Sequence, residues 1–290
     1  MRKVLFLVLL LTSLTACAFS QNFNADFKQL VDKNDSNGQA VLLKKWGAAK
    51  PDDPELFVAY FNHYIGRGRN EVLTLSPASK IAGGAVLAEG ATYDEKNYKL
   101  ALFYIDKGIA KFPDRLDMRF GKTYLLGENR DYVNFTAEIV KTIDRSNENK
   151  NHWLWMENKP VKDPQKFMLN SIQDYVGQLF DSGDEQVDYI KTVAEAALRY
   201  YPDSVENLSD LAVYYIFREK YDDALAPLLK AEKLAPADVI VLNNIATCYE
   251  GKADKENAIK YFEMVIKNGD EKAKVGARQR IAKLKGNQSL

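Results

Sequence analysis

The apolar residues in the carboxy-terminal third of the chain repeat with a fixed period. When the stretch 202–236 is shifted forward so that its start falls on Pro236, its apolar positions fall on apolar positions of the next stretch. The matched pairs are Leu208 with Leu242, Leu211 with Ile245, Ala212 with Ala246, Tyr215 with Tyr249, Ala224 with Ala258, Leu228 with Phe262 and Ala231 with Val265. A fixed period of this length indicates a repeat array, in which each unit buries its apolar side against its neighbours.

Each period predicts two helices. Leu208, Leu211, Ala212 and Tyr215 follow the spacing i, i+3, i+4, i+7, which places them on one face of a helix. A second apolar stripe begins at Ala224, after a short turn at 218–220. The alanines favour close approach of antiparallel helices, because small side chains let the backbones come near each other. The pattern therefore predicts an all-α protein of stacked helical hairpins.

These residues resemble the tetratricopeptide repeat (TPR) family, whose 34-residue pattern asks in order for tryptophan, leucine-glycine, tyrosine, alanine, phenylalanine, alanine and proline. The first unit meets it with Leu208, Leu211-Ala212, Tyr215, Ala224, Leu228, Ala231 and Pro236. The second meets it with Leu242, Ile245-Ala246, Tyr249, Ala258, Phe262 and Val265, and has Asp270 in place of the proline. The resemblance covers residues 202–270 and is weaker upstream. It implies a right-handed α-α superhelix, or solenoid, of TPR-like hairpins.

The rest of the chain follows the same pattern with less regularity. Residues 21–66 predict atypical amino-terminal helical hairpins, and residues 93–201 predict degenerate TPR-like hairpins. Residues 202–270 form the two clear TPR units. Residues 271–290 predict a capping helix and a tail, with the polar outer face that the end of an array requires.

Two stretches interrupt the helical pattern. Residues 67–92 hold several glycines and Pro77, and predict an irregular insertion loop that is either packed on the array or a poorly ordered linker. Residues 145–165 are polar and contain Trp153 and Trp155. These tryptophans either anchor a partner or fill a seam between neighbouring units, and the seam is the favoured interpretation.

Residues 1–20 have the composition of a secretory signal peptide. Arg2 and Lys3 form a positive start, an apolar run follows at 4–11, and small and polar residues come next. No later run of about 18 apolar residues predicts a membrane span. We therefore expect an exported protein, located in the periplasm or held at the outer membrane of a Gram-negative bacterium.

Two processing sites compete in this leader. The residues at 18–20 suit ordinary signal peptidase, with Gln21 as the first mature residue. The residues at 14–17 resemble a bacterial lipoprotein box, which would make Cys17 a lipidated first residue. Ordinary cleavage is slightly favoured, and a lipid on Cys17 would be the only membrane attachment.

Charge and candidate chemistry exclude several classes of function. Forty basic residues balance forty acidic ones, whereas a nucleic-acid-binding protein needs a basic surplus. Gly121-Lys122-Thr123 lacks the upstream glycine of a phosphate-binding loop. His63 and His152 have no neighbours of metal-ligand type at the spacing of a metal site. Cys248 is interpreted as a small buried side chain. We expect no enzyme activity, no cofactor and no metal; a hydrolase would need one of the histidines beside a carboxylate and a nucleophile.

The resemblance also implies a concave groove lined by the first helix of each unit. The groove-facing candidates are Asp210, Val213, Phe217, Asn243, Asn244 and Thr247. Asn244 lies where many peptide-binding members of the family place an asparagine that contacts the ligand backbone, and an amide can donate and accept at once.

Lys274 and Arg278, one turn apart on the predicted final helix, extend this surface and resemble half of the family's carboxylate clamp. The other half is missing, because Glu206 and Asp210 are acidic where that clamp has lysine and asparagine. Solvated charges on a capping helix are the favoured interpretation of this pair.

These observations lead to two hypotheses of function. The first is a non-catalytic exported TPR scaffold whose concave groove binds a peptide or protein partner in the cell envelope. The second is a lipid-anchored structural tether of an envelope complex without a dedicated groove ligand. The oligomeric state stays open.

Overall fold

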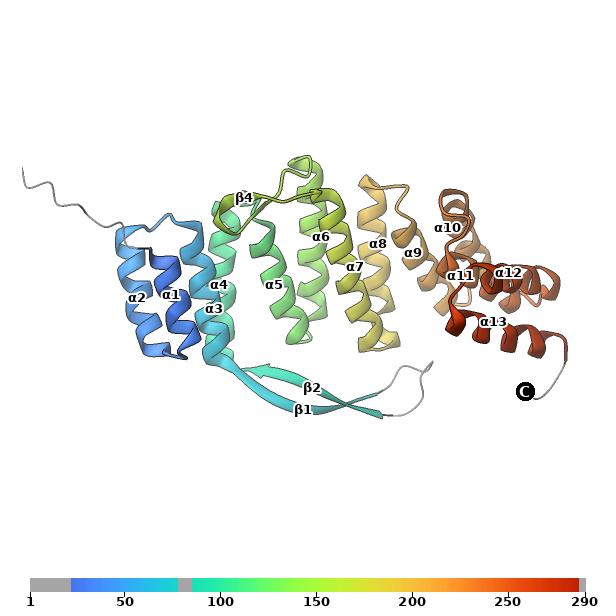
Figure 1. The fold of residues 1–290 in the computed structure, drawn as a ribbon, viewed down its shortest axis with the longest axis horizontal. Helices are drawn as coiled ribbons and strands as arrows, with labels where there is room; N and C mark the ends of the chain where they lie inside the picture. The colour runs from blue at the N-terminus through green and yellow to red at the C-terminus, as the bar shows by residue number, and fades with distance from the viewer. Residues whose placement is uncertain (1–21, 78–84, 287–290) are drawn as a thin grey trace, which may run out of the picture.

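The computed structural model describes residues 22–77 and 85–286. Over these residues the chain forms a row of antiparallel helical hairpins that follow one another in sequence order (Figure 1). The helices are α1 (Phe23–Asp32), α2 (Ser36–Ala49), α3 (Pro54–Gly68), α4 (Glu95–Lys111), α5 (Leu116–Glu128), α6 (Tyr132–Glu148), α7 (Pro164–Ser182), α8 (Val187–Tyr200), α9 (Val205–Phe217), α10 (Tyr221–Leu234), α11 (Val239–Gly251), α12 (Lys255–Asn268) and α13 (Glu271–Leu284). The expected array of helical hairpins is confirmed.

The period of the sequence is also the period of the structure. The shift that carries Leu208 onto Leu242 also carries the start of α9 onto the start of α11, and the start of α10 onto the start of α12. The repeated alanines at positions 212, 224, 246 and 258 are fully buried in one apolar cluster. α13 packs on α12 as a single helix at the end of the row. Small side chains therefore lie where the helices approach each other most closely.

The turns inside four of the hairpins share one backbone feature. A residue with positive φ follows the first helix, at Asn34, Arg130, Glu219 and Ala253. Glu219 and Ala253 are one period apart, so the two clear units turn in the same way. The left-handed conformation reverses the chain within a few residues, which lets the second helix pack back on the first.

Residues 67–92 differ from the expected irregular loop. The structure has two strands there, β1 (Arg69–Pro77) and β2 (Ala85–Tyr93), paired antiparallel from Arg69–Tyr93 to Pro77–Ala85. This stretch contains strand-forming residues at 72–75 and 86–87, but the glycines and serines around them led to the prediction of a loop. The ribbon is inserted between α3 and α4 and extends away from their lower ends (Figure 1).

The base of this ribbon is fixed to the array. The amide N–H of Asp94 donates to the carbonyl oxygen of Gly68 at 2.9 Å. A Cβ added at Gly68 would lie 2.8 Å from the Cβ of Asn97, so only glycine fits against α4 at this position. The insertion is therefore anchored where it leaves the helices.

The second interruption, between α6 and α7, contains the two-residue strands β3 (Leu154–Trp155) and β4 (Lys159–Pro160). Trp153 is only 1% exposed and lies in the core cluster that includes Leu116 of α5 and Met168 of α7. Trp155 is half-buried, and its ring meets that of Phe167 edge-on at 5.3 Å. The interpretation of Trp153 as a seam filler between units is confirmed.

A buried ion pair holds this insertion against the array. The guanidinium of Arg115, which is 0% exposed, lies 2.7 Å from Glu55 of α3 and 2.8 Å from Asp117 of α5. The backbone N–H of Glu157 donates to the same Glu55 carboxylate at 2.7 Å. Burial alone would lower the pKa of Arg115, but the hydrogen bonds from its guanidinium to Asp117 and Glu55 raise it. The arginine stays charged and ties the insertion to two helices.

The candidate phosphate-loop residues lie inside α5. Lys122 is ion-paired with Asp106 of α4 at 2.7 Å and with Glu138 of α6 at 2.9 Å. A lysine held by two carboxylates on neighbouring helices has a packing role, which agrees with the rejection of a phosphate-binding loop.

Two glycines provide a test of the close packing. A Cβ added at Gly108 of α4 would lie 2.9 Å from the sulfur of Met118 and 3.0 Å from the Cβ of Phe57, whereas one added at Gly276 of α13 meets nothing within 4 Å. We expect Gly108→Ala to lower the free energy of unfolding by roughly 1–3 kcal/mol through overpacking. Gly276→Ala should raise it by up to about 1 kcal/mol through helix propensity. Urea unfolding measures both, and equal effects of the two substitutions would contradict the packing described here.

Candidate partner-binding surface

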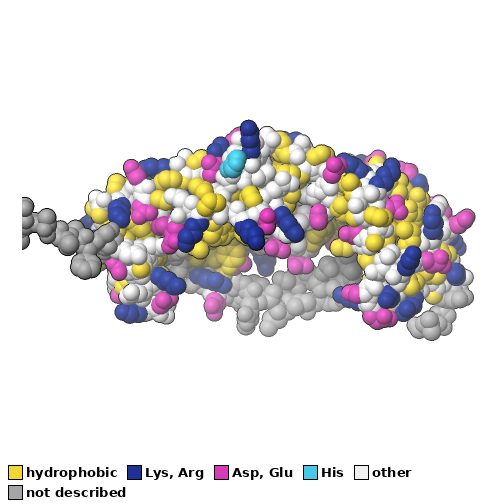
Figure 2. Space-filling view, turned by 45° about the horizontal axis from the view of Figure 1, so that its top comes forward, with side chains coloured by type: hydrophobic (Ala, Val, Ile, Leu, Met, Phe, Trp, Pro, Cys, Tyr) yellow, Lys and Arg dark blue, Asp and Glu magenta, His cyan; other side chains and the backbone are white. Residues whose placement is uncertain are grey.

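The first helices of the last units lie in a row. α9 packs directly on α11, and each is followed by its own second helix. In the space-filling view the described part of the molecule is an arch whose visible face carries lysine, arginine, aspartate and glutamate side chains interspersed (Figure 2). The row of first helices is where the sequence predicts the binding groove.

Five of the predicted groove residues are at least partly exposed on α9 and α11. Asn243 and Phe217 are exposed, and Val213, Asn244 and Thr247 are half-buried. The Thr247 hydroxyl donates to the carbonyl oxygen of Asn243 at 2.9 Å, so it is already engaged. Among the described residues no hydrogen bond uses the Asn244 amide, which leaves its donor and acceptor available to a ligand.

Asp210 is not an open groove residue. Its side chain is only 8% exposed, and its carboxylate accepts a hydrogen bond from Gln173 of α7 at 3.0 Å. Gln173 also donates to Asn207 of α9 at 3.3 Å. Burial raises the pKa of Asp210 to about 7, the Gln173 hydrogen bond opposes this, and nearby Glu206 raises it further. Asp210 therefore belongs to the contact between α7 and α9, a contact that the repeat pattern alone does not reveal.

The predicted basic pair on α13 does not converge on an open site. Arg278 is exposed and ion-paired with Glu271 of the same helix at 3.2 Å. Lys274 is half-buried and forms no ion pair with any described residue. This arrangement favours the interpretation as charges on a capping helix.

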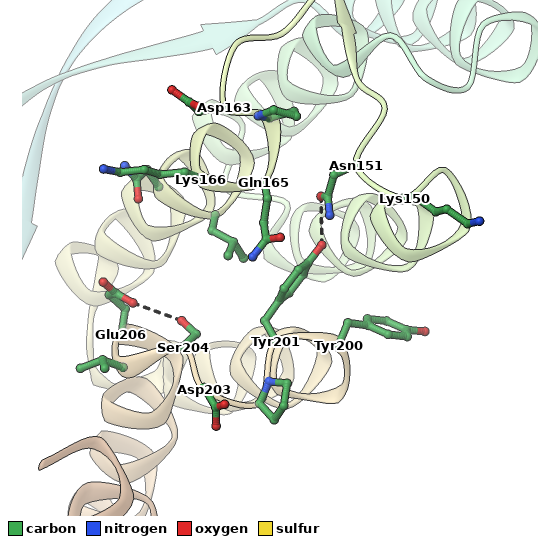
Figure 3. A pocket seen from close by; sticks show the side chains of 15 residues that line it. Lys150, Asn151, Asp163, Gln165, Lys166, Tyr200, Tyr201, Asp203, Ser204 and Glu206 are labelled. Atoms are coloured by element: carbon green, nitrogen blue, oxygen red, sulfur yellow. Dashed lines mark hydrogen bonds between the residues drawn. The ribbon is translucent and has the colours of Figure 1, made fainter. Parts of the chain in front are cut away.

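The structure adds a site that the sequence did not indicate, which we call the α7–α9 cleft. It is a cavity of about 940 Å³ in the middle of the row, on the side where α7 and α9 begin and α8 ends (Figure 3). Its lining residues are Lys150, Asn151, Asp163, Pro164, Gln165, Lys166, Leu169, Asn170, Tyr200, Tyr201, Pro202, Asp203, Ser204, Val205 and Glu206.

Hydrogen bonds fix one wall of this cleft and leave the opposite wall free. The Tyr201 hydroxyl donates to Asn151 at 3.0 Å, and the Ser204 hydroxyl donates to Glu206 at 3.1 Å (Figure 3). The Gln165 side chain extends from α7 toward Tyr201 and Ser204 (Figure 3). None of the hydrogen bonds between described residues uses the side-chain amides of Gln165 or Asn170.

The insertion between α6 and α7 shapes the cleft. Lys150, Asn151 and Asp163 all have positive φ, at 53°, 59° and 46°. Such backbone conformations are costly for residues other than glycine and persist only where the surrounding structure holds them. The buried Trp153 and the Arg115 ion pairs supply that support. No periodic signal in the sequence marks the cleft, because it arises where the repeat is interrupted.

The remaining candidate residues show no catalytic arrangement. His63 is buried, its Nδ1 lies 2.9 Å from the Gln39 side chain, and its pKa is lowered by burial and by Arg67. His152 is exposed, with its Nδ1 2.8 Å from the carbonyl oxygen of Asn149. Cys248 is buried, which raises the pKa of its thiol to about 12. In the described residues neither histidine has a carboxylate and a nucleophile beside it.

The described residues contain no group of three or more His, Cys, Asp or Glu side chains that could hold a metal ion. They also contain no helix long and apolar enough to cross a membrane. Cys17 and the predicted leader lie outside the described residues.

Comparisons with known proteins give fold-level similarity only. No family model matches the chain, and no curated protein matches it. A tetratricopeptide repeat protein from Parabacteroides merdae is 13% identical over 91% of this chain and 86% of that one, with a TM-score of 0.40. The RpL4 assembly chaperone Acl4 is 10% identical over 91% and 97%, with a TM-score of 0.39. The TPR domain of P58(IPK) is 14% identical over 92% and 66%, with a TM-score of 0.35. The chain's own helices and their contacts identify it as an array of TPR-like hairpins.

Asp210 makes stability depend on pH in a defined direction. Its folded-state pKa of about 7 exceeds the ordinary value of 3.8, so between these pH values the folded state binds more protons than the unfolded state. The free energy of unfolding should therefore fall as pH rises through this window, by at most about 1.4 kcal/mol per pH unit from this group. Asp210→Asn should remove that slope and be more stable than wild type above pH 7.

Urea unfolding of both proteins across the window measures this effect. Asp203→Asn is the matched control, because Asp203 is exposed and pairs only with Lys230 at the surface. Parallel stability curves for wild type and Asp210→Asn would contradict the assignment of Asp210 to the buried α7–α9 contact.

Proposed function

We propose that this protein is a non-catalytic interaction scaffold that binds a peptide or protein partner along its row of first helices. The observation that carries the proposal is the surface shared by α9 and α11. There Val213 and Phe217 of α9 offer apolar area, Phe217 being 39% exposed, and Asn244 of the adjoining α11 offers a side-chain amide that no hydrogen bond between described residues uses. Apolar area and an uncommitted donor and acceptor on adjoining helices suit a polypeptide, whose backbone needs hydrogen bonds and whose side chains need burial.

The cellular setting is a second part of the proposal. The positive start and apolar run of residues 1–20 support export, and we place the mature protein in the envelope of a Gram-negative bacterium. Charged side chains of both signs share the surface, which favours a protein partner over nucleic acid.

A lipid-anchored tether is the alternative. The box ending at Cys17 supports it, because a lipidated cysteine at the mature start would fix one end of the array to a membrane. A tether of this kind needs no dedicated groove ligand.

Asn244→Ala tests the groove. Purified mature protein, tagged at its carboxyl end, is used to capture partners from an envelope extract of the native organism with and without a crosslinker. We expect Asn244→Ala to reduce recovery of the wild-type partner by about tenfold. Without the Asn244 amide, a main-chain group of the partner is buried in the groove without its hydrogen bond, which costs about 1–2 kcal/mol of binding free energy.

Asn37→Ala on α2 is the matched control, because Asn37 is exposed and lies at the other end of the array. Its recovery should equal that of wild type. If wild-type protein enriches nothing over the bare resin even with the crosslinker, or if Asn244→Ala recovers as much as wild type, groove binding is wrong.

The mature amino terminus separates the scaffold from the tether. Intact mass spectrometry of protein from the native organism should show a chain that begins at Gln21. A chain beginning at a diacylglyceryl Cys17 would instead support the tether.

A further inference from the structure

We infer that the α7–α9 cleft binds an extended, uncharged stretch of partner polypeptide through its main-chain amide groups. This inference rests on the proposed function, because it assigns to the same kind of ligand a site outside the predicted groove. The evidence is the size of the cleft, the charge around it and the side-chain amides that line it.

The size of the cleft suits a ligand of several residues. Its volume of about 940 Å³ falls in the range of roughly 300–1,000 Å³ that ligand sites occupy. Pro164, Leu169 and Val205 contribute apolar surface from α7 and α9, and Pro202 contributes it from the turn before α9. These side chains can cover small apolar residues of a bound segment.

The charges around the cleft do not select a charged ligand. Lys150 and Lys166 point away from its centre (Figure 3). Asp203 is ion-paired with Lys230 at 2.9 Å, and Glu206 accepts a hydrogen bond from Ser204. Charges of both signs, Asp163 among them, therefore lie at the edge, and of these lining charges Asp203 is ion-paired. The centre holds amides, hydroxyls and a tyrosine ring. A ligand with a net charge at its centre would lose hydration there without gaining a counter-charge.

The free amides match a peptide backbone in chemistry. Gln165 and Asn170 both line the cleft and can each donate and accept, and Asn151 keeps its amide N–H groups after its oxygen accepts from Tyr201. Gln165 and Asn170 are five residues apart on α7, so their side chains leave the helix in directions about 140° apart. They can therefore contact separate main-chain amide groups of a bound segment.

The inference can be tested with a displayed random-peptide library selected on mature wild-type protein. A peptide of the enriched sequence is synthesised with a fluorescent label, and its affinity is measured by anisotropy. We expect the double variant Gln165→Ala/Asn170→Ala to weaken binding by about tenfold or more, since it removes two sets of backbone hydrogen bonds. N-methylation of one central peptide nitrogen should weaken binding to wild type, and added salt should change the affinity little.

Lys150→Ala/Lys166→Ala is the matched control, because both lysines line the cleft from opposite sides and point outward. It should bind as wild type does, and thermal unfolding of every variant confirms that the array is intact. A selected peptide with an invariant charged residue and a steep salt dependence would overturn the inference of an uncharged ligand.

The outcomes separate this inference from the proposed function. If peptides bind, lose affinity with Asn244→Ala and keep it with Gln165→Ala/Asn170→Ala, then the groove is the site and the cleft inference is wrong. If wild-type protein selects no peptide at all, the cleft inference is wrong, and the envelope capture alone decides the proposed function. Loss of affinity with the α7 double variant but not with the lysine control supports the cleft.

Discussion

The close packing of small side chains between neighbouring helices is the constraint on which the rest of this structure depends. Ala212, Ala224, Ala246 and Ala258 are fully buried and recur with the repeat, so each hairpin meets the next in the same way. Because the backbones approach closely, the larger residues Leu228 and Phe262 fill the spaces beside them. A regular spacing of hairpins follows, and with it a continuous row of first helices. The proposed groove exists only because this spacing is kept.

The middle of the chain meets the same requirement with different chemistry. Between α3 and α6 the repeated alanines are lost, and ion pairs add to the apolar contacts between the helices. Arg115 joins α3 and α5, and Lys122 joins α4, α5 and α6. Separating the partners of such a pair leaves a buried charge unpaired, which is strongly destabilising. The pairs therefore favour one relative position of the helices that they join. The Arg115–Glu55 pair also holds the insertion after α6, because Glu157 and Asn158 bond to it, and that insertion lines part of the α7–α9 cleft.

The sequence predicted the parts of the fold that follow from periodicity. The two clear units, the capping helix and the role of Trp153 all follow from local spacing and side-chain size. The β1–β2 ribbon was missed because its glycines and serines resemble those of a loop, and its pairing joins positions as distant in the chain as Arg69 and Tyr93. Asp210 was assigned to the groove because it lies on the predicted groove-facing side of its helix. The structure shows that Gln173 of α7 covers it, and no local sequence pattern indicates that α7 lies this close to α9. The cleft was missed because residues with left-handed backbone conformation shape it in the insertion between α6 and α7. The repeat pattern is interrupted there, so the period gives no prediction for this segment.

One scaffold therefore carries two kinds of surface: the proposed groove on α9 and α11, and a cleft created by an irregular insertion. Both involve first helices of the hairpins. Hydrogen–deuterium exchange of the mature protein, with and without its captured partner, tests this placement most directly. We expect slower exchange confined to α7, α9 and α11 and the turns that precede them. Slower exchange confined to the second helices α6, α8, α10 and α12 would contradict it.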